Sequence, residues 1–207
     1  MNNLTDKVVI VTGAGRGIGA AMAVAMAAAG AKVCVNDLNP DRAERVAQQI
    51  RENGQTAVSV AVDVSNKFQC SHLIDETRRQ FGRIDVLINN AAIKPTSVLL
   101  KTDEFEWQRV MDVNVKGAFF MSQLVGRVMA DEGIEGTIIN IGSTAGMILP
   151  MPQHVAYATS KAALAGFSAS CATAYAPHGI GVHLLTLDEE ETAVSTVLEQ
   201  IAALFEA

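Results

Sequence analysis

The sequence alternates short runs of apolar, β-branched residues with longer segments of helical character. Six runs are rich in Val and Ile and have the length of strands: residues 7–12, 32–37, 57–61, 85–89, 137–141 and 180–185. Continuously apolar runs of this length are typical of strands buried on both faces of a sheet. Helical segments are expected near residues 17–29, 41–53, 67–81, 103–131 and 158–176. This alternation predicts one parallel sheet with helices on both faces and right-handed crossovers.

Turn and cap residues support these boundaries. Asn39-Pro40 and Ser65 are typical of helix starts. Glycines that can end helices follow three of the helical segments, at Gly30, Gly54 and Gly82. No repeat or low-complexity linker divides the chain, so we expect residues 1–187 to form a single α/β domain.

Residues 188–207 differ in charge from the rest of the chain. They contain six acidic residues and no basic one, so they account for the whole net charge of −6. An apolar stripe at helical spacing follows the first acidic residues, at Val194, Leu198, Ile201 and Phe205. Acidic residues suit a helix N-terminus. We therefore expect an amphipathic helix over residues 189–206 that packs on the domain or on another subunit.

The composition excludes several classes of function. An apolar fraction of 49% is ample for a core, and the negative net charge argues against a nucleic-acid-binding surface. Cys34, Cys70 and Cys171 lack paired spacing and the histidines lack ligand spacing, so we expect reduced thiols and no metal site. The N-terminus is not a secretory signal, and the uncharged run 18–31 is too short to span a bilayer. These features predict a cytoplasmic protein without a membrane or nucleic-acid partner.

A glycine-rich turn joins the first predicted strand to the first predicted helix. It reads Thr12-Gly13-Ala14-Gly15-Arg16-Gly17-Ile18-Gly19. Glycines bring backbone N–H groups close to a pyrophosphate, and the helix N-terminus adds partial positive charge. Asp37 ends the second predicted strand, where a carboxylate accepts hydrogen bonds from an adenosine ribose. The pattern predicts a dinucleotide site; the alternative is a loop that only packs a helix on a strand.

Two side chains point to different dinucleotides. A carboxylate at Asp37 would repel the 2′-phosphate of NADP, whereas Arg16 could pair with it. The carboxylate would be desolvated beside that phosphate, while an exposed Arg16 can move away. We therefore predict NAD as the cofactor, with NADP as the less favoured alternative. The simplest interpretation of Arg16 is a solvated side chain that does not contact the cofactor.

Lys161 is the only Asp, Glu, Lys or Arg in residues 136–187. Tyr157 precedes it by four residues, so the two side chains share one face of a helix. An ammonium beside a phenol favours the phenolate and lowers the tyrosine pKa from about 10, which suits a general acid/base. Ser143 follows the fifth predicted strand, at the end where such sheets bind ligands. The alternative is a surface lysine beside a tyrosine used for packing.

In chain order, these motifs resemble the short-chain dehydrogenase/reductase family. The resemblance covers about residues 5–186 and includes the glycine-rich turn, Asp63-Val64, Asn89-Asn90-Ala91-Ala92, Asn114, Ser143 and Tyr157-Ala158-Thr159-Ser160-Lys161. It implies a doubly wound, Rossmann-like fold of about six strands. One domain would then carry both the cofactor site and the catalytic residues.

The resemblance implies a role for each matching residue. Tyr157 would exchange a proton with the substrate oxygen, Lys161 would tune Tyr157 and hold the nicotinamide ribose, and Ser143 would polarise the carbonyl. Asn114 would hold a water in a proton relay to Lys161, unless it only satisfies a helix kink. The implied cofactor contacts are Gly13, Arg16, Gly17, Ile18, Gly19, Asp37, Asp63, Val64, Asn90, Tyr157 and Lys161, although Asp63 could instead cap a turn.

The sequence departs from the family pattern after the sixth predicted strand. Leu187-Asp188 stands where a Pro-Gly pair is usual, and one further helix follows. We therefore expect a shortened C-terminus without the usual substrate lid, which makes water harder to exclude from the reaction site. Uncharged residues 168–173 and the apolar segment 103–131 could form a subunit interface or be buried within one chain. The family resemblance favours the interface and implies a homodimer or homotetramer.

Three functions remain open from the sequence. The first is an oxidoreductase that transfers a hydride between NAD(H) and a secondary alcohol or ketone, with Tyr157 as general acid/base. The second is an NADPH-dependent reductase of 3-oxoacyl thioesters, which Arg16 would permit. The third is a nucleotide-binding protein with weak or no catalysis, because the lid is missing.

Overall fold

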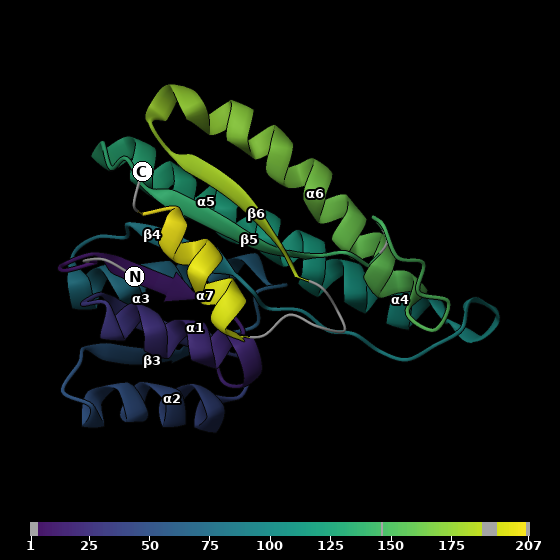
Figure 1. Cartoon of the computed structure of the whole chain (residues 1–207), viewed down its shortest axis with the longest axis horizontal. Helices are drawn as coiled ribbons and strands as arrows, with labels where there is room; N and C mark the ends of the chain where they lie inside the picture. Colours follow the sequence, from purple (N-terminus) through teal and green to yellow (C-terminus); the bar gives the residue numbers. More distant parts are fainter. Residues whose placement is uncertain (1–3, 146, 188–193, 206–207) are drawn as a thin grey trace.

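The computed structural model describes residues 4–145, 147–187 and 194–205 (Figure 1). Within them, a six-stranded parallel sheet has the order β3-β2-β1-β4-β5-β6. The strands are β1 (Val8–Val11), β2 (Lys32–Asp37), β3 (Ala57–Ala61), β4 (Val86–Asn89), β5 (Thr137–Ser143) and β6 (Gly181–Leu187). The order reverses between β1 and β4, which makes a doubly wound sheet with its switch point there. The predicted fold class is confirmed.

Helices cover both faces of the sheet. The α-helices are α1 (Gly17–Ala28), α2 (Pro40–Glu52), α3 (Lys67–Phe81), α4 (Glu104–Met111), α5 (Gly117–Glu132), α6 (Val155–Tyr175) and α7 (Val194–Ala203). Short turns of 3₁₀ helix occur at η1 (Leu99–Lys101) and η3 (Ala176–His178). One core cluster joins α1, α2 and α7 to one face, and a second joins α3 and α5 to the other. Adjacent strand residues such as Val9 and Ile10 serve opposite clusters, which explains why the strands are apolar throughout.

The caps agree with the sequence except at one helix start. Asn39 Oδ1 accepts a hydrogen bond from Arg42 N and begins α2 as predicted. The prediction that Ser65 begins the third helix is wrong by one residue, because Asn66 accepts the N-terminal hydrogen bonds of α3. Ser65 Oγ donates instead to Asp63 Oδ1 at 2.7 Å. Both residue types cap helices well, so local preference could not separate them.

The predicted single helix over residues 103–131 is wrong in one respect. The structure divides it into α4, a π-helical turn η2 (Asp112–Lys116) and α5. Asn114 lies in the π turn and exchanges two hydrogen bonds with the backbone of Ile93: Ile93 N donates to its Oδ1 at 2.8 Å, and its Nδ2 donates to Ile93 O at 3.0 Å. A π turn inside a helix often marks a functional position. The predicted helix 158–176 also begins earlier, at Val155.

The C-terminal helix α7 packs against α1 and β6, and Figure 1 shows it beside α1. Val197 and Ile201 are fully buried, while Leu198 and Phe205 are partly buried against the same core cluster. The buried stripe therefore centres on Val197, which the sequence analysis did not include. Residues 189–193 and 206 of the expected helix 189–206 lie outside the described residues.

Replacing Gly126 in α5 tests the packing of α5 against α6. A Cβ there would lie 2.4 Å from Cζ of Tyr175, whose hydroxyl donates to Ser122 O at 2.9 Å. We expect Gly126→Ala to cost about 1–3 kcal/mol of the free energy of unfolding, since the ring must move. Chemical denaturation measures the effect.

The matched control is Gly166→Ala in α6, where no atom lies within 4 Å of the added Cβ. We expect this change to stabilise the protein by about 0.5–1 kcal/mol through helix propensity. Equal effects of the two substitutions would contradict the packing argument.

Candidate functional site

The glycine-rich turn lies in close contact with the chain that follows β4. A Cβ at Gly13 would lie 2.7 Å from Cα of Ala91, and one at Gly19 would lie 2.4 Å from Nδ2 of Asn90. Gly13 also has φ +61°, a conformation that side chains disfavour. Only glycine fits at these two positions. They bring the ends of β1 and β4 together at the switch point of the sheet.

Thr12 and Asn90 fasten these two segments to each other. Thr12 Oγ1 accepts hydrogen bonds from Asn90 N at 3.0 Å and Ala91 N at 3.1 Å. In the other direction, Asn90 Nδ2 donates to Thr12 O at 2.9 Å and Gly13 O at 3.1 Å. Thr12 is almost completely buried, so these bonds are shielded from water. Asn90 therefore fixes the shape of the turn as well as lining the site.

Asp37 holds the other side of the turn. Its Oδ2 accepts a hydrogen bond from Gly15 N at 3.0 Å, and its Oδ1 accepts one from Asn39 N at 2.9 Å. Asp37 is 8% exposed, and these two hydrogen bonds hold its carboxylate in place at the end of β2. Bonds to two backbone N–H groups leave lone pairs on both oxygens for further donors.

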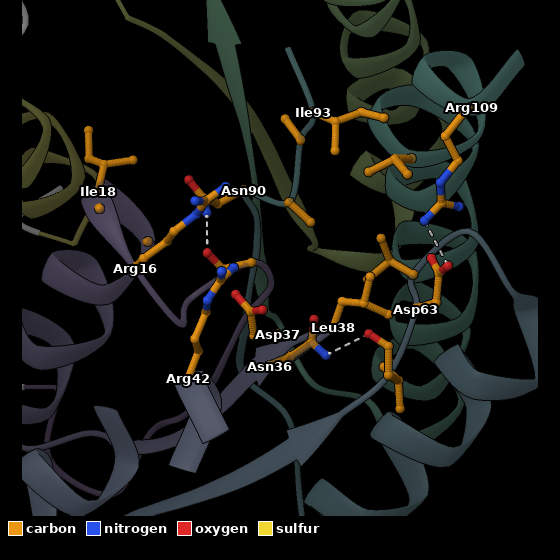
Figure 2. Close-up of a pocket in the computed structure, with 18 residues that line it drawn as sticks. Arg16, Ile18, Asn36, Asp37, Leu38, Arg42, Asp63, Asn90, Ile93 and Arg109 are labelled. Carbon is orange, nitrogen blue, oxygen red and sulfur yellow. Dashed lines mark hydrogen bonds and ion pairs between the residues drawn. The ribbon is translucent and has the colours of Figure 1, made fainter. Parts of the chain in front are cut away.

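A cleft of about 410 Å³ opens beside these residues (Figure 2). Nine residues that the sequence analysis assigned to the cofactor line it together: Gly13, Arg16, Gly17, Ile18, Gly19, Asp37, Asp63, Val64 and Asn90. A Cβ added at Gly17 would meet no atom within 4 Å, so the backbone of the turn faces open space at that point. This cradle of backbone and helix N-terminus fits a dinucleotide phosphate.

The cleft also contains residues that the sequence analysis missed. Figure 2 shows Arg42 on the same side as Arg16 and Asp37, and Leu38 exposed nearby. Arg42 lies in the first turn of the helix after β2, a position whose distance from the glycine-rich turn depends on the tertiary fold. Two arginines and one carboxylate thus share this end of the cleft.

Asp63 lies at the other side of the cleft and is paired with Arg109 (Figure 2). Arg109 donates to Asp63 Oδ2 at 3.0 Å and to Ser65 Oγ at 2.8 Å. Partial burial alone would raise the pKa of Asp63, but the hydrogen bonds from Ser65 and Arg109 and the charge of Arg109 lower it. Asp63 therefore caps a turn, which the sequence analysis gave as the alternative to a cofactor contact. It also faces the cleft as an ionised group.

Tyr157 and Lys161 occupy successive turns of α6 and are both buried. Tyr157 is 8% exposed and Lys161 4% exposed, and Lys161 Nζ lies 5.7 Å from the centre of the Tyr157 ring. The ammonium donates to Ile141 O of β5 at 2.6 Å. Ser143, at the end of β5, is also buried, and its Oγ accepts a hydrogen bond from Ala145 N at 2.9 Å.

Asn114 connects three parts of this region. Besides its two bonds to Ile93, its Nδ2 donates to Ser160 Oγ of α6 at 2.9 Å. It shares with Lys161 a small cavity of about 10 Å³ that Thr12, Asn89 and Ala91 also line. Among the described residues, Asn89 Oδ1 has no hydrogen-bond partner. A polar cavity of this size is close to the smallest that holds one water.

Other chemistries find no support in the described residues. Burial raises the pKa of the Cys34 thiol and of the Cys70 thiol to about 12, so neither forms a thiolate nucleophile near neutral pH. No group of three or more His, Cys, Asp or Glu side chains that could hold a metal ion occurs in the part of the chain that the structure describes. None of its helices is long and apolar enough to span a membrane.

Comparison with known proteins adds family information. A family model described as short chain dehydrogenase matches residues 7–200. The chain is 38% identical over 181 residues to an uncharacterized oxidoreductase of Thermotoga maritima, covering 87% of this chain and 70% of that protein. It is 40% identical over 184 residues to a 3-oxoacyl-[acyl-carrier-protein] reductase of Synechocystis sp., covering 88% of this chain and 74% of that protein.

Solved structures agree with this similarity. An NAD⁺-bound xylitol dehydrogenase has a TM-score of 0.85 and 32% identity, covering 95% of this chain and 75% of its own. A gluconate 5-dehydrogenase from Burkholderia cenocepacia, in complex with NADP and tartrate, has a TM-score of 0.85 and 34% identity, covering 97% of this chain and 78% of its own.

Thr12 offers a test of the contact between the two loops. Thr12→Val keeps the shape but leaves the partly buried N–H groups of Asn90 and Ala91 without this acceptor, which we expect to cost roughly 2–4 kcal/mol of the free energy of unfolding. Thr12→Ser keeps the hydroxyl and is expected to cost at most about 1 kcal/mol for one lost methyl group. Urea denaturation of the two variants measures the difference, and equal losses would contradict the role of the hydroxyl.

Proposed function

Because this chain belongs to the short-chain dehydrogenase family, we propose that it transfers a hydride between a nicotinamide dinucleotide and a secondary alcohol or ketone. The observation that carries the proposal is the buried Tyr157–Lys161 pair on α6. Lys161 lines a small cavity that shares Ala91 with the dinucleotide cleft, so the cavity and the cleft are contiguous. Tyr157 lines neither of them, and it is connected to the cleft through Lys161, whose ammonium lies 5.7 Å from the centre of its ring.

We assign the cofactor contacts to the residues that line the cleft. The glycine-rich turn and the N-terminus of α1 would hold the pyrophosphate, Asp37 the adenosine ribose, and Lys161 the nicotinamide ribose. The nicotinamide supplies or accepts the hydride when it is bound. The protein contributes position, charge and the proton.

Tyr157 is the proposed general acid and base. In reduction its hydroxyl donates a proton to the carbonyl oxygen, and in oxidation the phenolate accepts the proton of the alcohol. Lys161 is held by Ile141 O and stabilises the phenolate by its charge. Ser143, at the end of β5, is the proposed group that polarises the substrate carbonyl, and its Oγ is held by a hydrogen bond from Ala145 N. The polar cavity beside Asn114 and Lys161 supports a water-mediated proton relay there.

For the cofactor we propose NAD. The Asp37 carboxylate is fixed by Gly15 N and Asn39 N, so it cannot turn away from a 2′-phosphate. Arg16 is exposed and can turn away. The presence of Arg42 beside it favours NADP as the second candidate, and similar proteins bind each dinucleotide. The fixed, buried charge of Asp37 is expected to outweigh the exposed Arg16 and the half-buried Arg42, because burial strengthens its repulsion of a phosphate.

A second candidate reaction is the reduction of 3-oxoacyl thioesters. Its support is the similarity to the reductase from Synechocystis. The two reactions use the same Tyr157 chemistry and differ in the substrate alone. A panel of secondary alcohols, polyols and acetoacetyl thioesters, assayed with both dinucleotides, distinguishes them, and nucleotide binding without turnover would favour a non-catalytic nucleotide-binding protein.

We also propose that the chain forms a homodimer or homotetramer. Large apolar side chains are exposed on α4, on α5 and before α4, at Val98, Leu99, Leu100, Phe105 and Phe119. Exposed apolar groups of this size commonly mark an interface.

Removing the proposed proton donor tests the chemistry directly. We expect Tyr157→Phe to lower kcat by about 10²–10⁴-fold, because general acid–base catalysis contributes that much. Binding of the dinucleotide, followed by NADH fluorescence, is expected to change little. The control is Tyr175→Phe, at the far end of α6. It removes the hydrogen bond to Ser122 O and is expected to retain activity; equal activity in wild type and Tyr157→Phe would remove Tyr157 from the mechanism.

Cofactor choice has a separate test. We expect the wild-type protein to bind NADH more tightly than NADPH in a fluorescence titration. Asp37→Asn is expected to narrow that difference by about tenfold or more, because the repelling charge is gone. Asp41→Asn removes an equal charge in the first turn of α2, outside the cleft, and is expected to leave the ratio unchanged. Tighter binding of NADPH by the wild type would overturn the proposal of NAD.

A further inference from the structure

A second lysine lies near the proposed proton donor. Lys94 Nζ is 5.2 Å from the centre of the Tyr157 ring, slightly closer than Lys161 Nζ at 5.7 Å. The two ammonium groups differ in environment, since Lys161 is buried and Lys94 is exposed. Lys161 is used by the proposed proton transfer, whereas Lys94 is not.

The backbone on both sides of Lys94 is firmly attached. On one side, Ile93 exchanges two hydrogen bonds with the Asn114 side chain. On the other side, Pro95 O accepts a hydrogen bond from His154 Nδ1 at 2.7 Å, and Ser97 N donates to Gln153 O at 2.8 Å. The segment is thus held between the π turn and the start of α6. The position of Lys94 beside Tyr157 follows from these contacts and not from the lysine side chain alone.

This geometry gives Lys94 access to a molecule that reacts at Tyr157. The substrate oxygen must lie within hydrogen-bond distance of the Tyr157 hydroxyl to exchange a proton with it. The ammonium of the exposed Lys94, 5.2 Å from the centre of the Tyr157 ring, can donate to another group of the same molecule. Ammonium groups bind carboxylate and phosphate oxygens most strongly, at about 2.8 Å. A substrate with a short carbon chain between its reacting oxygen and its anionic group is long enough to contact both Tyr157 and Lys94.

We propose that Lys94 binds an anionic group of the substrate, so that the preferred substrates are short hydroxy or oxo compounds bearing a carboxylate or a phosphate. The proposal rests on the proposed oxidoreductase function and names its substrate class. Lys94 is then a specificity-determining residue that contacts the substrate, while Lys161 serves the proton donor. The two lysines divide between them the tasks of selecting the substrate and promoting its reaction.

Matched substrates test this assignment. The probes are 3-hydroxybutanoate and its uncharged methyl ester for a carboxylate, and glycerol 3-phosphate and glycerol for a phosphate. We expect lower KM values for the charged member of at least one pair. Lys94→Met is expected to raise the KM for that charged member by about 10–100-fold, the loss of a hydrogen bond to a charged group, and to leave the KM of its neutral partner unchanged.

Two further variants serve as controls. Lys94→Arg keeps the charge and is expected to restore most of the preference for the anionic substrate. Lys101→Met removes an exposed lysine at the end of η1 and is expected to change neither KM. Loss of activity toward charged and neutral substrates alike in Lys94→Met, with a shifted pH profile, would overturn the proposal, since it would mean that Lys94 acts on Tyr157 alone.

Direct binding separates this proposal from the proposed function. Isothermal titration of the NAD⁺-loaded protein with 3-hydroxybutanoate and with glycerol 3-phosphate requires no turnover. Tighter binding of either anion by the wild type than by Lys94→Met supports the proposal even if the panel shows no activity, in which case only the proposed reaction fails. Equal binding by both proteins, or binding of neither anion by the wild type, overturns the assignment of Lys94.

Discussion

The close approach of two backbone segments at the switch point of the sheet controls the rest of this structure. β1 and β4 are neighbours in space although two strands and three helices separate them in the chain. At their carboxyl ends Gly13 and Ala91 come so close that a Cβ on residue 13 would lie only 2.7 Å from Cα of Ala91. The Thr12 hydroxyl and the Asn90 amide then satisfy the backbone groups that this approach buries. The cleft opens at this point because the chain turns in opposite directions on its two sides.

Hydrogen bonds of two buried side-chain amides, those of Asn89 and Asn140, connect the sheet to α6, the helix that bears Tyr157. Asn89 Nδ2 of β4 donates to Ser122 Oγ of α5 and to Asn140 Oδ1 of β5. Asn140 Nδ2 donates in turn to Ser168 Oγ of α6. Since buried polar groups left without partners are costly, these bonds fix α5 and α6 on the sheet in one register. Together with the bond from Lys161 to β5, they determine where the proton donor stands.

The sequence predicted what depends on local pattern and missed what depends on contacts between distant segments. The six strands follow from continuous apolar runs, and the glycine-rich turn and Asp37 follow from their places beside the first two strands. Asp63, Val64 and Asn90 were expected only from the family resemblance. The π turn at Asn114 was not predictable, because it is coupled to hydrogen bonds with Ile93, 21 residues away. The pairing of Arg109 with Asp63 spans 46 residues, and the contact of Lys94 with Tyr157 joins the segment after β4 to α6, which no periodicity relates. The cap of α3 was misplaced by one residue for a local reason: Ser65 and Asn66 both suit a cap, and Ser65 bonds to Asp63 instead.

The two lysines near Tyr157 differ in burial. Lys161 is 4% exposed, so its ammonium has lost most of its hydration, and the bond to Ile141 O and the nearby phenol help to offset that loss. Burying a charge is costly for a fold, which is why the only charged residue in residues 136–187 pointed to chemistry in the sequence. Lys94 is exposed, and its ammonium lies 5.2 Å from the centre of the same ring. Burial therefore restricts the choice of residue at position 161 more than at position 94, and position 94 is the one whose residue can follow the charge of the substrate.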